Sequence, residues 1–279
     1  MLNLGKRNTL VVTEIFPLGF ALDHPETPLS SPIMLKETER AFEVGEQLDV
    51  FVYTQADGQL LASLNQAKLE REQFASLVVK GASAHGYFFD WGMEHDLYAP
   101  ETQVHTQLDM GSNYVVYLTQ DKLGKLIGTT KIERYLEADG SDLSPKQAVS
   151  LLIYAQTPLG FKAVVDNKYQ GLLFKSDLIS SLKVGQKIDG FIKNIRDDGK
   201  IDLSLQLINQ KSRATLADTI LDDLAAHDGM STLTDKSSPD DIFAHFKVSK
   251  AAYKKAIGSL YKAKKIRIEK NCIYLVENK

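Results

Sequence analysis

The chain has 279 residues, of which 43% are hydrophobic and 25% are charged, and this globular composition excludes wholesale disorder. No apolar run approaches the ~20 residues needed to cross a bilayer. The N-terminal stretch is interrupted by Lys6, Arg7 and Glu14, so it lacks the apolar core of a signal peptide. The single cysteine, Cys272, excludes an intrachain disulfide. We therefore expect a cytoplasmic protein with no membrane partner.

The net charge of −3 is unevenly distributed along the chain. Residues 1–145 hold 11 basic and 21 acidic residues, whereas residues 247–270 hold nine basic residues and one acidic residue, Glu269. If the protein binds a polyanion, the C-terminal half is expected to do most of it. The alternative is that these lysines only form a solvated helix face.

Three segments share one glycine pattern, which indicates an internal repeat. In each copy a glycine is followed by a second one 25 or 26 residues later, by a third after 13 or 14 more, and by a hydroxyl residue after another five. The three sets are Gly19, Gly45, Gly58 and Ser63; Gly86, Gly111, Gly124 and Thr129; and Gly160, Gly185, Gly199 and Ser204.

Each copy predicts a small all-β module of about five short strands. The second glycine precedes a β-branched and aromatic run, at residues 48–53, 114–118 and 188–192, and such runs favour strands. The third glycine predicts a hairpin turn, most clearly in the Asp-Gly pairs at 57–58 and 198–199. The size suits a Greek-key barrel, and we expect the modules to span residues 1–66, 67–137 and 145–208.

The third module resembles the S-one-type RNA-binding repeat, an OB-fold family, in its segments 160–164, 169–176 and 199–204. The resemblance implies a surface of aromatic rings and lysines that binds RNA. Lys162 occupies a position where the family usually has an aromatic residue, and Phe174 replaces a family histidine. In the second module Phe88 fits the aromatic position, whereas the first module has Ala21 there, so we do not expect the acidic first module to contact RNA.

From residue 214 to 279 the hydrophobic period changes from two to about 3.6, which indicates helices. One helix ends near Asp228-Gly229. Ser238 and Pro239 predict the start of a second, and Ser249 the start of a third that runs from Lys250 to Lys262. Two short strands, 266–268 and 273–275, complete a predicted winged helix, whose third helix is the element that such folds place against nucleic acid. Protein docking is the alternative role of this domain.

The fold class we expect is therefore mainly β: three tandem S-one-type OB-fold barrels followed by an α+β winged-helix domain. This order resembles the conserved virulence factor B family of bacteria, most specifically in the segments 90–92, 182–187 and 235–242. The resemblance implies an RNA-binding regulatory protein in which several domains share one RNA, and it does not imply catalysis.

No catalytic or metal-binding motif is present, so we expect neither an enzyme nor a cofactor. The chain lacks a metalloprotease HExxH motif, a phosphate-binding loop and a nucleophile elbow. A metal held by His85, Glu94, His95 and His105 is disfavoured, because isolated loop histidines are usually solvated.

We predict that rings stack on unpaired bases and that lysines neutralise phosphates. The predicted RNA-binding residues are Phe161, Lys162, Tyr169, Phe174, Lys175, Lys193 and Arg196 in the third module, Tyr87, Phe88 and Trp91 in the second, and Lys250, Lys254, Lys255, Lys262, Lys264, Lys265 and Arg267 in the winged helix. For the third-module rings the alternative is a place in the core, since strand residues alternate sides. For Trp91 it is a structural plug beside Gly92.

The expected function is binding of single-stranded RNA with little sequence preference, which would regulate gene expression after transcription. One alternative is a DNA-binding transcription regulator that uses its winged helix. Another is an adaptor of the ribosome or RNA polymerase. The sequence leaves the oligomeric state open, with a monomer favoured.

Overall fold

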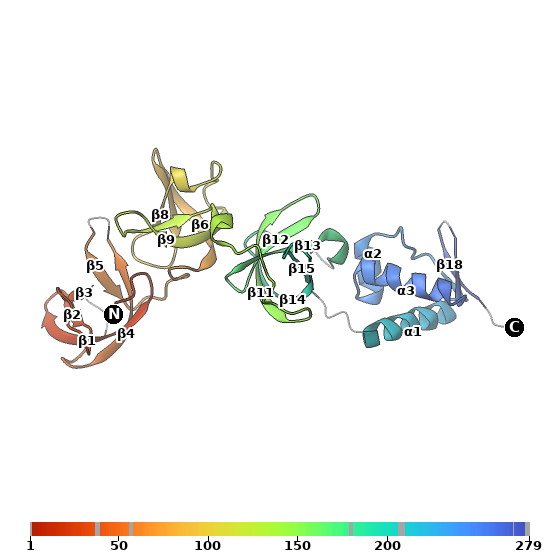
Figure 1. The fold of residues 1–279 in the computed structure, drawn as a ribbon, viewed down its shortest axis with the longest axis horizontal. Coiled ribbons are helices and arrows are strands. Elements are labelled where there is room, and N and C mark those ends of the chain that lie inside the picture. The colour runs from red at the N-terminus through yellow and green to blue at the C-terminus, as the bar shows by residue number, and fades with distance from the viewer. Residues whose placement is uncertain are drawn as a thin grey trace. The chain divides into compact units, whose positions relative to one another are not determined.

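The computed structural model describes residues 2–36, 40–55, 58–178, 181–205, 210–269 and 271–276. Asp57, of the predicted turn at 57–58, lies outside the described residues. The chain forms two compact units, Met1–Leu136 and Glu137–Lys279. In Figure 1 the first runs from red to yellow-green and the second from green to blue.

The first unit begins with a closed five-stranded barrel in the order β1-β2-β3-β5-β4. Parallel pairing of β3 with β5 closes the barrel, and the other strand pairs are antiparallel. The inward side chains of Leu10, Leu22, Ile33 and Val50 are fully buried, as the alternation of strand side chains requires. The strands are β1 (Arg7–Phe16), β2 (Gly19–Asp23), β3 (Ile33–Lys36), β4 (Gln47–Thr54) and β5 (Leu60–Ser63).

The second sheet repeats this topology but is not closed by hydrogen bonds. Its order is β10-β9-β6-β7-β8, and β8 and β10 at its two edges do not pair. It is therefore a barrel-like sheet rather than the fully closed barrel expected from the sequence. Its strands are β6 (Phe74–Ser83), β7 (Gly86–Asp90), β8 (Leu97–Pro100), β9 (Asn113–Gln120) and β10 (Leu126–Thr129), with 3₁₀ turns η1 (Glu101–Gln103) and η2 (Ile132–Tyr135).

The second unit begins with another closed barrel, in the order β11-β12-β13-β15-β14, again closed by a parallel pair, β13 with β15. Its core includes Leu151, Ile153, Leu173 and Leu203, all fully buried. The strands are β11 (Ala148–Gln156), β12 (Gly160–Val165), β13 (Tyr169–Phe174), β14 (Lys187–Ile195) and β15 (Ile201–Ser204), with the 3₁₀ turn η3 (Lys175–Asp177) after β13.

The rest of the second unit is a winged helix, as predicted. Ser238 and Ser249 cap α2 and α3, where their hydroxyls accept hydrogen bonds from the backbone N–H groups of Asp241 and Ala252. The sequence did not indicate the short strand β16, which adds to the wing in the order β16-β18-β17. The elements are α1 (Gln210–Ala226), β16 (Met230–Ser231), α2 (Pro239–Phe246), α3 (Lys250–Lys262), β17 (Ile266–Ile268) and β18 (Ile273–Leu275).

The first glycine of each repeat allows two strands to approach closely. A Cβ at Gly19, Gly86 or Gly160 would lie 2.2, 2.2 or 1.9 Å from the carbonyl oxygen of the neighbouring strand. These oxygens belong to the backbone and cannot rotate away as a side chain can. The same strand-pair geometry therefore recurs three times, which explains why each repeat begins with a glycine.

Replacement of Gly160 by alanine is expected to lower the free energy of unfolding of the second unit by about 1–3 kcal/mol or more, because β12 and β13 must separate. Urea unfolding followed by circular dichroism measures this change. Gly258→Ala is the matched control, since a Cβ there meets no atom within 4 Å and should stabilise α3 by up to about 1 kcal/mol. A Gly160→Ala protein as stable as the parent would contradict the close-approach explanation.

No helix in the described ranges is long and apolar enough to cross a membrane.

Candidate nucleic-acid interface

A ring flanked by two cations lies on the outer face of the third barrel. Side chains of β13 alternate, with Tyr169, Gly171 and Leu173 buried and Phe174 half-buried on the opposite face. The Lys193 Nζ lies 6.0 Å from the Phe174 ring centroid and the Arg196 guanidinium carbon 5.6 Å from it. The fold of the third barrel thus brings together three of the predicted residues.

Both cations are held in place by carboxylates. Lys193 forms an ion pair with Asp177. The Arg196 Nη2 lies 2.7 Å from Asp202 Oδ1, and the hydrogen bond with Asp202 raises the pKa of Arg196. These ion pairs preorient Arg196 and Lys193 beside the ring, and about a third of each side chain is exposed.

Lys162 and Lys175 extend this outer face. Lys162 pairs across the sheet with Leu172, which shares the face of Phe174, and Lys175 follows Phe174 directly and is exposed. We call the five residues Phe174, Lys193, Arg196, Lys162 and Lys175 the third-barrel patch.

The prediction that Phe161 and Tyr169 belong to this face is wrong, because both rings point into the barrel. Phe161 is 5% exposed and Tyr169 is 4% exposed, and both belong to the barrel core. The Tyr169 hydroxyl donates to the Asp142 carboxylate and accepts a hydrogen bond from Lys168 Nζ. The hydrogen bond with Asp142 raises the pKa of Tyr169. The same bond ties the Tyr169 ring to the segment that precedes β11.

Trp91 in the first unit is buried, which favours the structural alternative over the predicted role as an RNA-stacking ring. Its ring is 4% exposed and forms edge contacts with Phe51 and Tyr53 of the first barrel, at centroid distances of 5.7 and 6.2 Å. The indole N–H donates to the His95 carbonyl oxygen at 2.6 Å. Trp91 therefore joins the first barrel to the second sheet.

Phe88 is a partly accessible ring of the second sheet. It is half-buried and lies 5.3 Å from the ring of Tyr98, its cross-strand partner on β8. Tyr87 is also half-buried, but it packs against the core, and its hydroxyl accepts a hydrogen bond from the Leu108 N–H at 3.3 Å. The sequence reasoning missed Tyr98, although the burial alternation of β8 places it on the outer face with Phe88.

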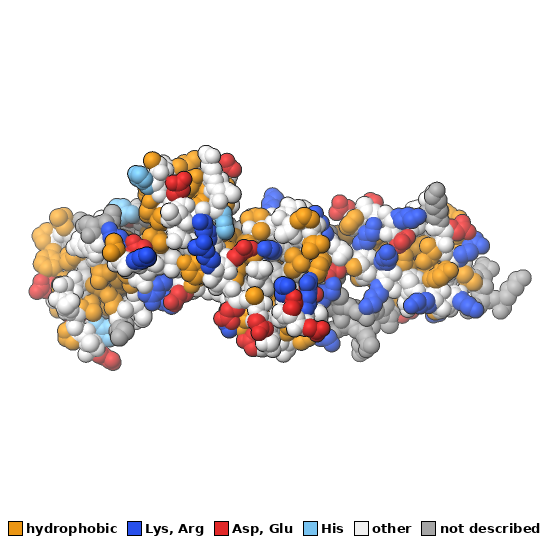
Figure 2. Space-filling model, turned by 45° about the horizontal axis from the view of Figure 1, so that its top comes forward, with side chains coloured by type: hydrophobic (Ala, Val, Ile, Leu, Met, Phe, Trp, Pro, Cys, Tyr) orange, Lys and Arg blue, Asp and Glu red, His pale blue; other side chains and the backbone are white. Residues whose placement is uncertain are grey.

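The predicted basic residues of the winged helix lie at its surface. Helix α3 buries the stripe Tyr253, Ala256, Ile257 and Leu260, which leaves its lysines outside. Figure 2 shows many Lys and Arg side chains on the visible face of this domain. Lys250 is half-buried, and the exposed residues are Lys254, Lys255, Lys262, Lys264, Lys265 and Arg267.

Two of these basic residues form ion pairs with acidic side chains. Lys254 lies 3.9 Å from Asp235, and Arg267 lies 3.2 Å from Glu269. The Arg267 guanidinium also lies 5.2 Å from the Tyr274 ring centroid, which orients it along the wing.

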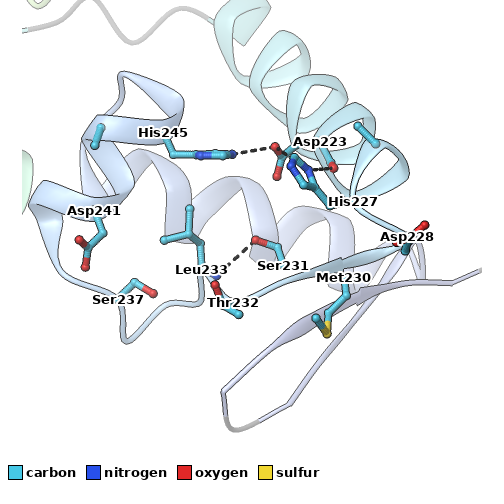
Figure 3. A pocket seen from close by; sticks show the side chains of 12 residues that line it. Asp223, His227, Asp228, Met230, Ser231, Thr232, Leu233, Ser237, Asp241 and His245 are labelled. Atoms are coloured by element: carbon cyan, nitrogen blue, oxygen red, sulfur yellow. Dashed lines mark hydrogen bonds and ion pairs between the residues drawn. The ribbon is translucent and has the colours of Figure 1, made fainter.

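Another face of the winged helix is chemically different (Figure 3). A cavity of about 920 Å³ lies between α1, α2 and β16, and its lining includes Asp223, Asp228 and Asp241 but no Lys or Arg. The Asp223 Oδ1 lies 2.7 Å from His245 Nε2 and 3.4 Å from His227 Nδ1. A polyanion would be repelled from these carboxylates, so the basic residues define the face that suits one.

The histidines considered for a metal site do not assemble one. Within the described part of the chain, no group of three or more His, Cys, Asp or Glu side chains is arranged to hold a metal ion. Glu94 forms an ion pair with Lys36 at 2.7 Å, and His95 contacts Gln55 at 3.1 Å.

Two domain families match the chain. The model of the S1 domain, the S-one-type module expected above, matches residues 4–65, and the CvfB-like winged helix domain matches residues 218–275. The S1 match falls on the first barrel, although the clearest motif in the sequence is that of the third. Neither family description names a catalytic activity.

Relatives are similar along most of the chain. Conserved virulence factor B of Staphylococcus epidermidis is 25% identical over 90% of this chain and 88% of its own. The uncharacterized protein YitL of Bacillus subtilis is 23% identical over 97% and 93%. A crystal structure from Streptococcus pneumoniae, described as a multidomain protein with nucleic acid binding domains, is 22% identical over 98% of both chains, with a TM-score of 0.42. The resemblance expected from the sequence is thus confirmed: the chain matches the S1 and CvfB-like winged helix domain models and is similar to conserved virulence factor B proteins along most of its length.

Proposed function

We propose that the protein binds single-stranded RNA, with little sequence preference, and regulates gene expression after transcription. The observation that carries the proposal is the third-barrel patch, where two oriented cations lie within about 6 Å of the centroid of a half-buried ring. Stacking of a base on such a ring and neutralisation of its phosphates by lysines are the two interactions that hold an unpaired strand.

The winged helix supplies a second basic surface for the same strand. Its exposed lysines project from α3 and the turn that follows it, and they are not accompanied by exposed rings except Tyr261 and the half-buried Tyr274. Such a surface contributes phosphate contacts and little base readout. The S1 and winged-helix families of the chain, and the description of the Streptococcus pneumoniae protein, support nucleic-acid binding.

A competition experiment with the full-length protein tests the proposal. We expect a labelled oligoribonucleotide to be displaced by unlabelled single-stranded RNA and only weakly by duplex DNA of equal length, because OB-type faces bind unpaired bases. Equal or better competition by the duplex would favour a DNA-binding regulator led by the winged helix. No retention of the oligoribonucleotide even in dilute buffer would refute nucleic-acid binding and favour a protein adaptor.

Phe174→Ala is expected to weaken oligoribonucleotide binding by roughly 5- to 150-fold, the equivalent of ~1–3 kcal/mol for one stacked base. Fluorescence anisotropy of a labelled oligonucleotide measures the affinity. Phe16→Ala is the matched control, since Phe16 is 42% exposed on the acidic first barrel and should leave the affinity unchanged. Equal effects of the two substitutions would remove the third-barrel patch from the proposal.

A further inference from the structure

A cavity of about 670 Å³ lies within the first unit, at the junction of the first barrel and the second sheet. The first barrel contributes Tyr53 and Gln55 from the end of β4, and the second sheet contributes Phe88, Trp91 and Tyr98. The volume is within the range of sites for small organic ligands, which are mostly apolar and carry a few polar groups.

The two walls of the cavity are fixed to each other. Tyr53 and Trp91 belong to one continuous hydrophobic core that spans both modules. Across the junction, Gln55 Nε2 lies 3.1 Å from His95 Nε2, and the Leu126 N–H lies 3.5 Å from Thr54 Oγ1. The cavity is therefore part of one folded body and needs no rearrangement of modules to form.

The cavity lies beside the open edge of the second sheet. In the first and third barrels the strands equivalent to β8 and β10 pair in parallel, but β8 and β10 do not pair. Leu97 and Tyr98 of β8 line the cavity together with Leu126 and Ile127 of β10. Residues of both edge strands therefore form part of the cavity wall.

The lining suits a flat, uncharged heterocycle better than a phosphate. The rings of Phe88 and Tyr98 are half-buried and lie 5.3 Å apart on the outer face. The charged residues at the rim have both signs, with Asp96 and Asp121 beside Lys125, so the cavity has no net attraction for an anion. The Gln55 amide and the His95 imidazole supply hydrogen-bond donors and acceptors of the kind that read base edges.

We propose that this cavity receives one nucleobase, stacked against Phe88 and Tyr98, from a bound strand or a free nucleotide. The proposal rests on the proposed function for its ligand class. It also gives the first barrel a part in recognition, through Gln55, that the charge distribution does not indicate.

Trp91 makes the proposal directly testable, because it lines the cavity and is the only tryptophan of the chain. Full-length protein is titrated with an oligoribonucleotide while Trp91 fluorescence and the anisotropy of a label on the RNA are recorded together. We expect Trp91 fluorescence to change with the same midpoint as the anisotropy. A second titration with adenosine, guanosine, cytidine and uridine monophosphates distinguishes a free nucleotide from a base of a strand.

The outcomes separate this proposal from the proposed function. An anisotropy increase with unchanged Trp91 fluorescence overturns the cavity as a base site and leaves RNA binding intact, whereas no response of either signal overturns both. Phe88→Leu should reduce the affinity reported by Trp91 about fivefold or more through loss of stacking, while Phe16→Leu, an exposed ring on the first barrel, should not. Unaltered Trp91 titrations in the Phe88→Leu protein would also overturn the site.

Discussion

Trp91→Ala is expected to lower the free energy of unfolding of the first unit by about 3–5 kcal/mol, the usual cost of truncating a large buried aromatic side chain. The indole ring is 4% exposed and packs edge-on against Phe51 and Tyr53. Its removal leaves a cavity in the only described core cluster that includes side chains of both modules. Urea unfolding followed by far-ultraviolet circular dichroism measures the change in the first unit's transition.

Trp91→Phe separates packing from hydrogen bonding. It keeps a ring in the core but removes the indole N–H that donates to the His95 carbonyl at 2.6 Å, which is worth about 1 kcal/mol. We expect it to be clearly more stable than Trp91→Ala. If the alanine variant lost less than about 1 kcal/mol, the ring would not be the structural junction that we describe.

Neutralising four winged-helix lysines is expected to reduce RNA affinity by roughly 100-fold or more at ~0.1 M salt. Each lysine that contacts a phosphate makes the slope of log affinity against log salt more negative by about 0.7 for a single strand. The four substitutions should therefore reduce the steepness of this slope by about 2.8. Binding isotherms at several salt concentrations measure both quantities. The substitutions are to glutamine at four exposed positions, Lys255, Lys262, Lys264 and Lys265.

A control of equal charge change excludes a general electrostatic effect. Four lysines of the acidic first unit are replaced by glutamine, and we expect less than a threefold change in affinity because they lie among an excess of carboxylates. Equal losses in the two variants would contradict a localised basic surface. No loss in the winged-helix variant would indicate that this domain docks on protein. The control positions are Lys6, Lys36, Lys80 and Lys122.

Much of the fold follows from local sequence signals. The glycine spacing predicted three similar β modules, and the first glycine of each, Gly19, Gly86 and Gly160, permits the same close strand contact. Helices α2 and α3 begin where Ser238 and Ser249 predicted them, since a capping hydroxyl satisfies backbone N–H groups that no other local group can reach.

The buried rings could not be assigned in the same way. Phe161, Tyr169 and Trp91 have the side chains of a stacking surface, and their burial depends on which face of a strand turns inward. A β-bulge between Ile153 and Ala155 shifts the register of β11 against β12, and nothing in the sequence marks it. Trp91 is covered by Phe51 and Tyr53 from another module, a contact that no local pattern contains.

The sequence was more informative about cations than about rings. Lys193 and Arg196 were predicted at the rim of a binding face that includes Phe174, and they lie 6.0 and 5.6 Å from its ring centroid. The open edge between β8 and β10 and the cavity beside it were not predicted, because the second module keeps the same glycines as the closed ones.

The continuous core of Phe51, Tyr53 and Trp91 has a consequence for how the protein is made. As the chain leaves the ribosome, the first barrel emerges with two rings that have no cover until about forty more residues have followed. The shared core therefore couples the folding of the first two modules, and cleavage between them would expose the apolar surfaces that Phe51, Tyr53 and Trp91 cover.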